Sequence, residues 1–271
     1  MQVFDVIPGD GPVVLGQPHG GTHVPETIAA RLNDNGRVLA DTDWHIARLY
    51  KGLLPGATVV RSNVHRYVID ANRDPAGASL YPGQNTTTLV PLTDFDGQAI
   101  WTEGQEPSED EIEARHVAYH APYHNALRQE LDRVRAKHGI AILFDCHSIR
   151  STIPFLFDGE LPIYNTGTNL GQTCAPEIER AVHGLAQASG RTSVLNGRFK
   201  GGWTTRHYGR PAVAIHAIQM EISQRAYMQE TPPWDFDARR AAQVRPDLQR
   251  ILETISELAL SGALTSERTD Q

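Results

Sequence analysis

The chain has 271 residues, enough to bury a large core in one α/β domain without disulfide bridges. It carries 25 Lys and Arg against 32 Asp and Glu, a net charge of −7 with histidine neutral, which argues against a nucleic-acid footprint or a polybasic membrane patch. Its two cysteines, Cys146 and Cys174, belong to no CxxC pair, so a thiolate metal site is not expected. With no apolar run of about 20 residues and no signal-peptide layout, the sequence predicts a cytoplasmic protein that acts on a small molecule.

Short β-forming runs alternate with amphipathic stretches along the chain. The predicted strands are 12–16, 57–62, 66–70, 139–145 and 214–222, and the predicted helices lie near 41–53, 109–138, 174–189 and 236–261. This alternation is typical of an α/β fold in which helices cover both faces of a mainly parallel, mixed sheet, a three-layer αβα sandwich. Because no linker or internal repeat divides it, we expect one domain over residues 1–262, followed by a flexible tail at 263–271.

Polar clusters follow several of the predicted strands. "QPHGG" follows the first strand, "ANRDP" the third and "DCHS" the fourth, and Glu221 lies near the end of the last. Ligands of such sheets bind just beyond the carboxyl ends of the strands, so the clusters predict one convergent site. The segment 74–105 is long, aperiodic and rich in Pro and Gly, which predicts a functional loop or lid.

Three features offer nitrogen and oxygen ligands for a divalent metal: His19, the acidic pair Asp41 and Asp43, and His147. A catalytic zinc takes three protein ligands of this kind and keeps one open position. Each feature also has a structural interpretation. His19 can be a loop residue beside two glycines, and His147 can bond a core carbonyl, although Asp145 could orient its ring. Asp41 can cap a helix that begins in "DWHIARLY", with Asp43 acting on the helix dipole.

Arginines and one glutamate complete the candidate site. "ANRDP" and "GRFKGGWTTRHYG" combine cations with flexible glycines, as a site for an anionic ligand requires. Glu221 follows the apolar run "AIHAIQM", and because an unpartnered buried acid is costly, a catalytic role is favoured. Any single arginine can instead form a surface ion pair, and this alternative applies to Arg66, Arg73, Arg198 and Arg206.

A histidine stripe presents a further alternative. His116, His120 and His124 recur at every fourth residue and could stack on one helix face. Pro122 interrupts that face, and the flanking residues fit an ordinary amphipathic helix. The pattern therefore favours a solvated or supporting stripe over a ladder of metal ligands.

Six separated motifs together resemble one known family. They are "PHGGT", "DTDWHIARLY", "RYVIDANRDP", "LFDCHSIRS", "NGRFKGGWTTRHYG" and "QMEISQRAYM". In this order and spacing, from about residue 12 to about residue 235, they resemble the N-formylglutamate amidohydrolase family. The resemblance implies the fold of zinc carboxypeptidases and aspartoacylases. It also implies zinc-dependent hydrolysis of N-formyl-L-glutamate to formate and L-glutamate, at the end of a histidine-degradation route.

The resemblance also implies a metal-ligand set. His19 and His147 match the two histidine ligands of Zn²⁺. Aspartoacylases place a glutamate ligand three residues after the first histidine, where this chain has Thr22. Asp43 is therefore expected to replace that ligand, with Asp41 as the alternative acid.

Further roles follow from the same resemblance. Asn72 and Arg73 match the clamp for a substrate carboxylate, Arg66 matches the arginine that polarises the scissile carbonyl, and Glu221 matches the general base. N-formylglutamate carries two carboxylates, so a second clamp is expected at Arg206 or Arg198. The expected partner is a small dicarboxylate, with neither nucleic acid nor membrane, and the protein is expected to be a monomer or a homodimer.

Two alternatives remain open from the sequence. The same scaffold could serve another metal-dependent N-acyl amino acid amidohydrolase or a carboxypeptidase. It could also serve a non-catalytic protein that binds an acidic amino acid. The joint presence of His19, His147 and Glu221 argues for an enzyme.

Overall fold

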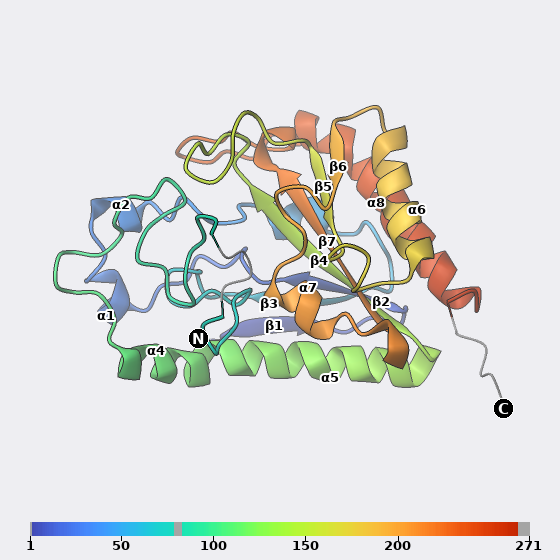
Figure 1. Ribbon diagram of the computed structural model, residues 1–271, viewed down its shortest axis with the longest axis horizontal. Helices are drawn as coiled ribbons and strands as arrows, with labels where there is room; N and C mark the ends of the chain where they lie inside the picture. Colours follow the sequence, from blue (N-terminus) through green and yellow to red (C-terminus); the bar gives the residue numbers. More distant parts are fainter. Residues whose placement is uncertain (1, 79–82, 265–271) are drawn as a thin grey trace.

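The computed structural model describes residues 2–78 and 83–264, and its elements form three layers (Figure 1). The strands are β1 (Phe4–Ile7), β2 (Val13–Gln17), β3 (Thr58–Ser62), β4 (Ala141–Ile149), β5 (Tyr164–Gly167), β6 (Ser193–Leu195) and β7 (Ile215–Ser223). They form one sheet in the order β1-β3-β2-β4-β7-β5-β6. Four neighbouring pairs are parallel, whereas β1 with β3 and β5 with β7 are antiparallel. The predicted mixed, mainly parallel sheet is confirmed.

Helices cover both faces of this sheet. They are α1 (Glu26–Ala29), α2 (Asp34–Arg37), α3 (Ile46–Tyr50), α4 (Glu109–Arg115), α5 (Ala121–His138), α6 (Pro176–Ala188), α7 (Trp203–Tyr208) and α8 (Ala238–Leu260). A π-helical turn, η1 (His116–His120), joins α4 to α5, and 3-10 turns occur at η2 (Pro211–Val213) and η3 (Gln224–Ala226). In Figure 1, α5 runs along one side of the sheet, while α6 and α8 lie together on the other.

The central strand β4 is buried along its whole length, and alternate residues face different helices. Leu143 belongs to the cluster that includes Leu127 and Leu131 of α5. Phe144 belongs to the larger cluster that includes residues of α3, α6 and α8. A strand covered on both faces needs apolar residues at every position, which explains the continuous run that predicted it. The strand extends to Ile149, so His147 lies within its carboxyl-terminal part rather than after it.

The predicted strand at 66–70 is wrong. These residues form a buried turn, in which the backbone N–H of Val68 donates to the carbonyl of His65. Their apolar side chains pack beside Val90 and Trp101 in a separate cluster instead of joining the sheet. A short apolar run indicates burial but does not by itself distinguish a strand from a buried turn.

Three strands were missing from the prediction. β1 has four residues, β5 four and β6 three, too few for a clear period of two. β1 and β6 form the two edges of the sheet. Their positions depend on pairing with distant segments, as in the register of Phe4 with Ser62.

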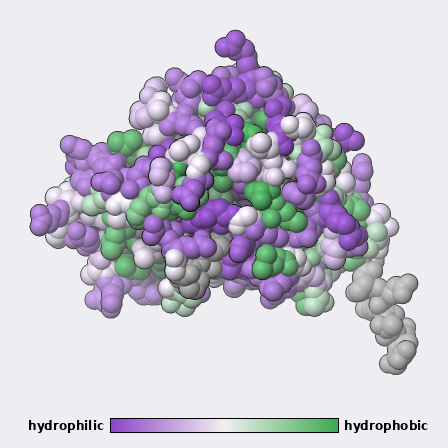
Figure 2. Space-filling view, turned by 45° about the horizontal axis from the view of Figure 1, so that its top comes forward, coloured by the Kyte–Doolittle hydropathy of each residue, from purple (hydrophilic) through white to green (hydrophobic). Residues whose placement is uncertain are grey.

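The described part of segment 74–105 contains no helix or strand and forms only isolated bridges, such as Thr93 with Ala99. Residues 79–82 of this segment, and 265–271 of the expected tail, lie outside the described residues. None of the described helices is long and apolar enough to cross a membrane. Over the face shown in Figure 2, apolar side chains are interspersed with hydrophilic ones.

Candidate active site

The three expected metal ligands meet at one point near the carboxyl end of the parallel strands. His19 follows β2, Asp43 precedes α3 and His147 belongs to β4. Each offers a ligand atom within 4.8 Å of the others, and all three side chains are buried. Oδ2 of Asp43 lies 3.3 Å from Nδ1 of His147 and 3.9 Å from Nδ1 of His19. Two imidazoles and a carboxylate form a donor set that suits a divalent metal such as zinc.

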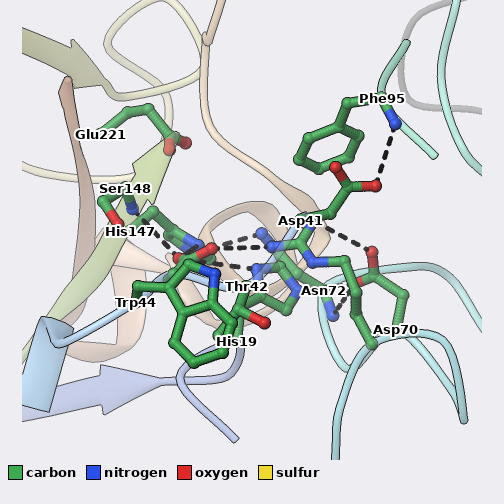
Figure 3. A network of polar contacts seen from close by, with 12 residues as sticks. His19, Asp41, Thr42, Trp44, Asp70, Asn72, Phe95, His147, Ser148 and Glu221 are labelled. Atoms are coloured by element: carbon green, nitrogen blue, oxygen red, sulfur yellow. Dashed lines mark hydrogen bonds and ion pairs between the residues drawn. The ribbon is translucent and has the colours of Figure 1, made fainter. Parts of the chain in front are cut away.

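Asp41, the alternative acid, points elsewhere (Figure 3). Its Oδ2 accepts hydrogen bonds from the hydroxyl of Tyr67 at 2.8 Å and from the backbone N–H of Phe95 at 2.9 Å. It does not cap a helix either, because α3 begins only at Ile46 with His45 at the N-cap position. Asp41 therefore anchors the segment around residue 95, and Asp43 is the acid that joins the two histidines.

Carboxylates hold the far nitrogen of each histidine. Nε2 of His19 lies 2.7 Å from Oδ1 of Asp70, and Nε2 of His147 lies 3.0 Å from Oδ1 of Asp145. A proton on each Nε2 leaves the lone pair of each Nδ1 facing Asp43, which is how metal-binding imidazoles are usually oriented. Nδ1 of His19 is buried and has no hydrogen-bond partner. This unpartnered atom is the direct sign that the residues fit a metal ion.

The charges around the two histidines also favour a cation. Burial, with the charge of Arg66 adding to it, lowers the pKa of His19 to about 4. Burial lowers the pKa of His147 too, but Asp145 and Asp43 outweigh it and raise that pKa well above its usual value. The carboxylates thus favour positive charge at His147, and a divalent ion on Nδ1 would supply it.

Arg66 links the two carboxylates of this network. Its Nη2 donates to Oδ1 of Asp43 at 2.9 Å, and its Nη1 lies 3.6 Å from Oδ2 of Asp70. The guanidinium also lies over the ring of Phe95, 4.9 Å from the ring centroid. A buried cation between two acids keeps both ionised, because burial alone would favour their neutral forms.

A cavity opens beside the three ligands. It is lined by His19, Arg66, Asn72, Arg73, Asn85, Thr86, Thr87, Phe95, His147, Ser148, Ile149, Leu156, Arg198, Phe199, Gly202, Gln219 and Glu221. Every expected site residue except two is in this set. Asp43 is not among the lining residues. Arg206, on α7, donates from Nε to the carbonyl of Gly201 at 2.9 Å and is not among the lining residues.

Glu221 faces the cavity from β7, and His147 is its register partner on β4. Its side chain is 7 % exposed. Burial raises the pKa of Glu221 to about 7, against a smaller lowering by His147. A carboxyl that titrates near neutral pH suits proton transfer. The structure therefore places the expected base beside the expected metal ligands.

The segment that carries Asn72 and Arg73 is held by two members of the histidine stripe. Nε2 of His120 lies 3.1 Å from the carbonyl oxygen of Arg73, and Nε2 of His124 lies 2.7 Å from that of Ala71. Since a carbonyl only accepts, both imidazoles donate. The supporting role predicted for the stripe is confirmed for these two residues.

Four hydrogen bonds hold two arginines at the cavity wall. Arg73 donates from Nε to the carbonyl of Thr87 at 2.8 Å and from Nη2 to its hydroxyl at 2.9 Å. Arg198 donates to the carbonyls of Leu156 and Asn85, each at 2.9 Å. Part of the predicted loop therefore forms a wall of the site and orients both arginines.

Three contributing residues were not assigned roles by the sequence analysis: Asp70, Thr205 and Gln219. Asp70 holds His19, the hydroxyl of Thr205 donates to Oδ2 of Asp145 at 2.8 Å, and Nε2 of Gln219 donates to Oε2 of Glu221 at 3.1 Å. Only Gln219 had a local signal, because residues two apart on a strand share one face. The other contacts join segments far apart in the chain.

Comparison with known proteins agrees with this geometry. Residues 11–228 match the family described as N-formylglutamate amidohydrolase. The chain belongs to this family. It is 44 % identical over 246 residues to an N-formylglutamate deformylase of Pseudomonas putida, covering 90 % of this chain and 92 % of the relative. It is 42 % identical over 249 residues to an N-formylglutamate deformylase of Pseudomonas aeruginosa, covering 91 % and 93 %.

Solved structures support the same fold for this family member. An N-formylglutamate amidohydrolase from Ralstonia eutropha superposes with a TM-score of 0.80 at 24 % identity, covering 97 % of this chain and all of the other. A gene product from Agrobacterium tumefaciens superposes with a TM-score of 0.72 at 19 % identity, covering 97 % and 96 %. At these identities the likeness concerns the fold alone.

Proposed function

We propose that this family member hydrolyses N-formyl-L-glutamate to formate and L-glutamate, with a divalent metal ion, Zn²⁺, held by His19, Asp43 and His147. The single observation that carries the proposal is the buried group of two imidazoles and a carboxylate, whose two histidines line one cavity together with Glu221. The two relatives named N-formylglutamate deformylase, similar over about nine-tenths of the chain, support the substrate.

The metal would act as a Lewis acid at this point, activating water and polarising the formyl carbonyl. Glu221 receives the proton that the attacking water loses and then delivers it to the amide nitrogen, so that the C–N bond breaks to a neutral amine. Its pKa of about 7 suits both transfers, since the carboxylate and the acid are each accessible near neutral pH. Arg66 faces the cavity and stabilises negative charge that develops on the carbonyl oxygen.

The substrate carboxylates are bound by the arginines of the cavity wall. Arg73, with the amide of Asn72, binds the α-carboxylate, and Arg198 binds the side-chain carboxylate. Arg198 is favoured over Arg206 because Arg198 lines the cavity. The loop segment around Thr87 acts as the wall behind them and as a lid on the site.

The same proposal extends to the organisation of the molecule. Residues 1–262 act as one domain, because the sheet draws strands from Phe4 to Ser223 and α8 continues to Leu260. The protein works in the cytoplasm on a small dicarboxylate, as a monomer or a homodimer.

The proposal is tested by metal quantification together with formate release. Purified protein is expected to contain about one divalent ion per chain and to release formate from N-formylglutamate. Chelation should abolish the release, and added Zn²⁺ should restore it. Metal-replete protein that releases no formate would refute the activity, whereas full activity after complete removal of metal would refute the role of the ion. Comparison with N-acetylglutamate measures the acyl specificity.

A further inference from the structure

Gln219 lies two residues before Glu221 on β7, and both side chains line the cavity. The two positions share one face of the strand because side chains alternate along it. Gln219 is 3 % exposed, so each of its polar atoms needs a partner. The side-chain amide of Gln219 has two hydrogen-bond partners, one for its oxygen and one for its nitrogen, and they fix the orientation of the amide.

The backbone N–H of Gly202 donates to Oε1 of Gln219 at 2.6 Å. A backbone N–H cannot accept, so the atom that faces it must be the amide oxygen. The NH₂ group of Gln219 therefore faces Oε2 of Glu221, at 3.1 Å. Because the N–H of Gly202 can only donate, the orientation of this amide is the same whether Glu221 is protonated or ionised.

Gly202 is itself a rigid anchor. It holds the N-cap position of α7, and a Cβ atom there would lie 2.2 Å from Nδ2 of Asn72. No larger residue fits without displacing that side chain. The Gly202 N–H, and with it the amide of Gln219, is consequently held by close packing between α7 and the segment that carries Asn72.

We propose that Gln219 is a positioning residue that keeps Oε2 of Glu221 as a hydrogen-bond acceptor, so that Oε1 alone carries the proton during the reaction. This rests on the proposed function, in which Glu221 is the base. Oε1 takes one proton from the water whose oxygen forms the new bond to the formyl carbon. The same proton passes from Oε1 to the amide nitrogen as the C–N bond breaks, giving formate and the free amine. Oε2 takes part in neither transfer, because an N–H already points at it.

The test is a double-mutant cycle on the metal-loaded enzyme. Gln219→Leu keeps the approximate size and removes the donor, and we expect kcat to fall about tenfold or more, the effect of one hydrogen bond to a charged group. KM and bound metal per chain should stay within about twofold of wild type. In a Glu221→Gln background, Gln219→Leu should cause no further fall, because the two residues act as one unit.

A second variant covers the case in which leucine disturbs the fold. Gln219→Glu preserves the bond from Gly202 but turns an acceptor toward Oε2, and it should lower kcat at least as far at pH 7, again with KM unchanged. Gln249→Leu is the matched control, since Gln249 donates to Glu253 at 2.8 Å on the exposed surface of α8. It should leave kcat at the wild-type value.

The outcomes separate this inference from the proposed function. Loss of turnover in Glu221→Gln alone tests whether Glu221 is the base. If that variant loses activity but both Gln219 variants keep wild-type kcat, the proposed function stands and the role of Gln219 is refuted. The role of Gln219 would also be refuted if Gln219→Leu lowered kcat by the same factor in the wild-type enzyme and in Glu221→Gln. The effect of the substitution would then not act through Glu221.

Discussion

The backbone N–H of Thr204 donates to Oδ1 of Asn72 at 2.8 Å, so an amide from a distant segment caps the first turn of α7. This bond fixes the amide of Asn72 and places its Nδ2 3.3 Å from Nε2 of His147. Nδ2 carries two hydrogens and only one of them can point at Nε2 of His147, so the other remains for a ligand in the cavity that Asn72 lines. One side chain thus joins α7, a proposed metal ligand and the proposed substrate site.

Replacing Asn72 should separate its two roles. Asn72→Asp keeps an acceptor for Thr204 but removes the donors, so we expect a rise in KM of about tenfold or more with little change in melting temperature. Asn72→Ala removes both and should lower the melting temperature as well. Steady-state kinetics and thermal unfolding measure the two effects. An unchanged KM in Asn72→Asp would remove this amide from substrate binding.

Metal affinity should depend on Asp43 and not on Asp41. Asp43→Asn replaces a charged ligand by a neutral one, and we expect binding of Zn²⁺ to weaken by more than about 100-fold, beyond the loss typical for an outer partner of a ligand. Asp41→Asn is the matched control, because its carboxylate bonds Tyr67 and the Phe95 amide instead. Titration with a chromophoric chelator gives both affinities, and equal weakening in the two variants would contradict the assignment.

Turnover should depend on the carboxylate of Glu221. Glu221→Gln retains the shape of the side chain but cannot accept the proton, so kcat should fall by about 10²-fold or more while metal content stays at the wild-type level. The exposed residue Glu257 provides the control, since Glu257→Gln should behave as wild type. Near-normal turnover in Glu221→Gln would exclude it as the base.

Selection of the second carboxylate should depend on Arg198. A bidentate arginine–carboxylate pair contributes about 1.5–3 kcal/mol, so Arg198→Ala should raise KM for N-formylglutamate at least tenfold more than for N-formylglutamine. Arg73→Ala should weaken the binding of both substrates, because both carry the α-carboxylate. Arg206→Ala, outside the cavity lining, should leave the ratio of kcat/KM for the two substrates unchanged. A changed ratio in Arg206→Ala alone would assign the clamp to that residue instead.

Stability should fall as the pH drops below 6.5. His65 is fully buried between the hydroxyl of Thr42 and the N–H of Tyr67, and burial lowers its pKa to about 3, with Arg66 adding to the effect. In the unfolded chain His65 is protonated below about pH 6.5, whereas in the folded protein it becomes protonated only below about pH 3. The contribution of neutral His65 to the free energy of unfolding is therefore complete above pH 6.5. Below pH 6.5 it is lost at about 1.4 kcal/mol per pH unit.

Urea unfolding at pH 7 and pH 5 measures this loss. His65→Asn should reduce the difference in unfolding free energy between the two pH values by about 2 kcal/mol relative to wild type. Since asparagine does not titrate, its own cost affects both pH values equally. A variant with the same pH dependence as wild type would show that His65 is not the source.

The sequence by itself determined the layered α/β fold and most of the site. β4 and β7 are buried on both faces, so they appear as long apolar runs, and the polar residues that interrupt them, His147 and Glu221, are conspicuous. Since the carboxyl ends of parallel strands lie at the same end of a sheet, the order of strands and polar residues in the sequence predicted that His147 and Glu221 would lie close together. The motif order indicated the family, which the comparisons confirmed.

The tertiary structure decided what the local pattern left open. Asp41 and Asp43 are two residues apart and alike in sequence, and only the partners that the fold brings to each distinguish a loop anchor from a histidine partner. The hold of Gln219 on Glu221 likewise depends on Gly202, and the orientation of Asn72 on Thr204. These bonds join residues from separate segments, and their geometry depends on how the whole chain packs. A short polar side chain carries no periodic signal of its distant partner, so such contacts are absent from local sequence.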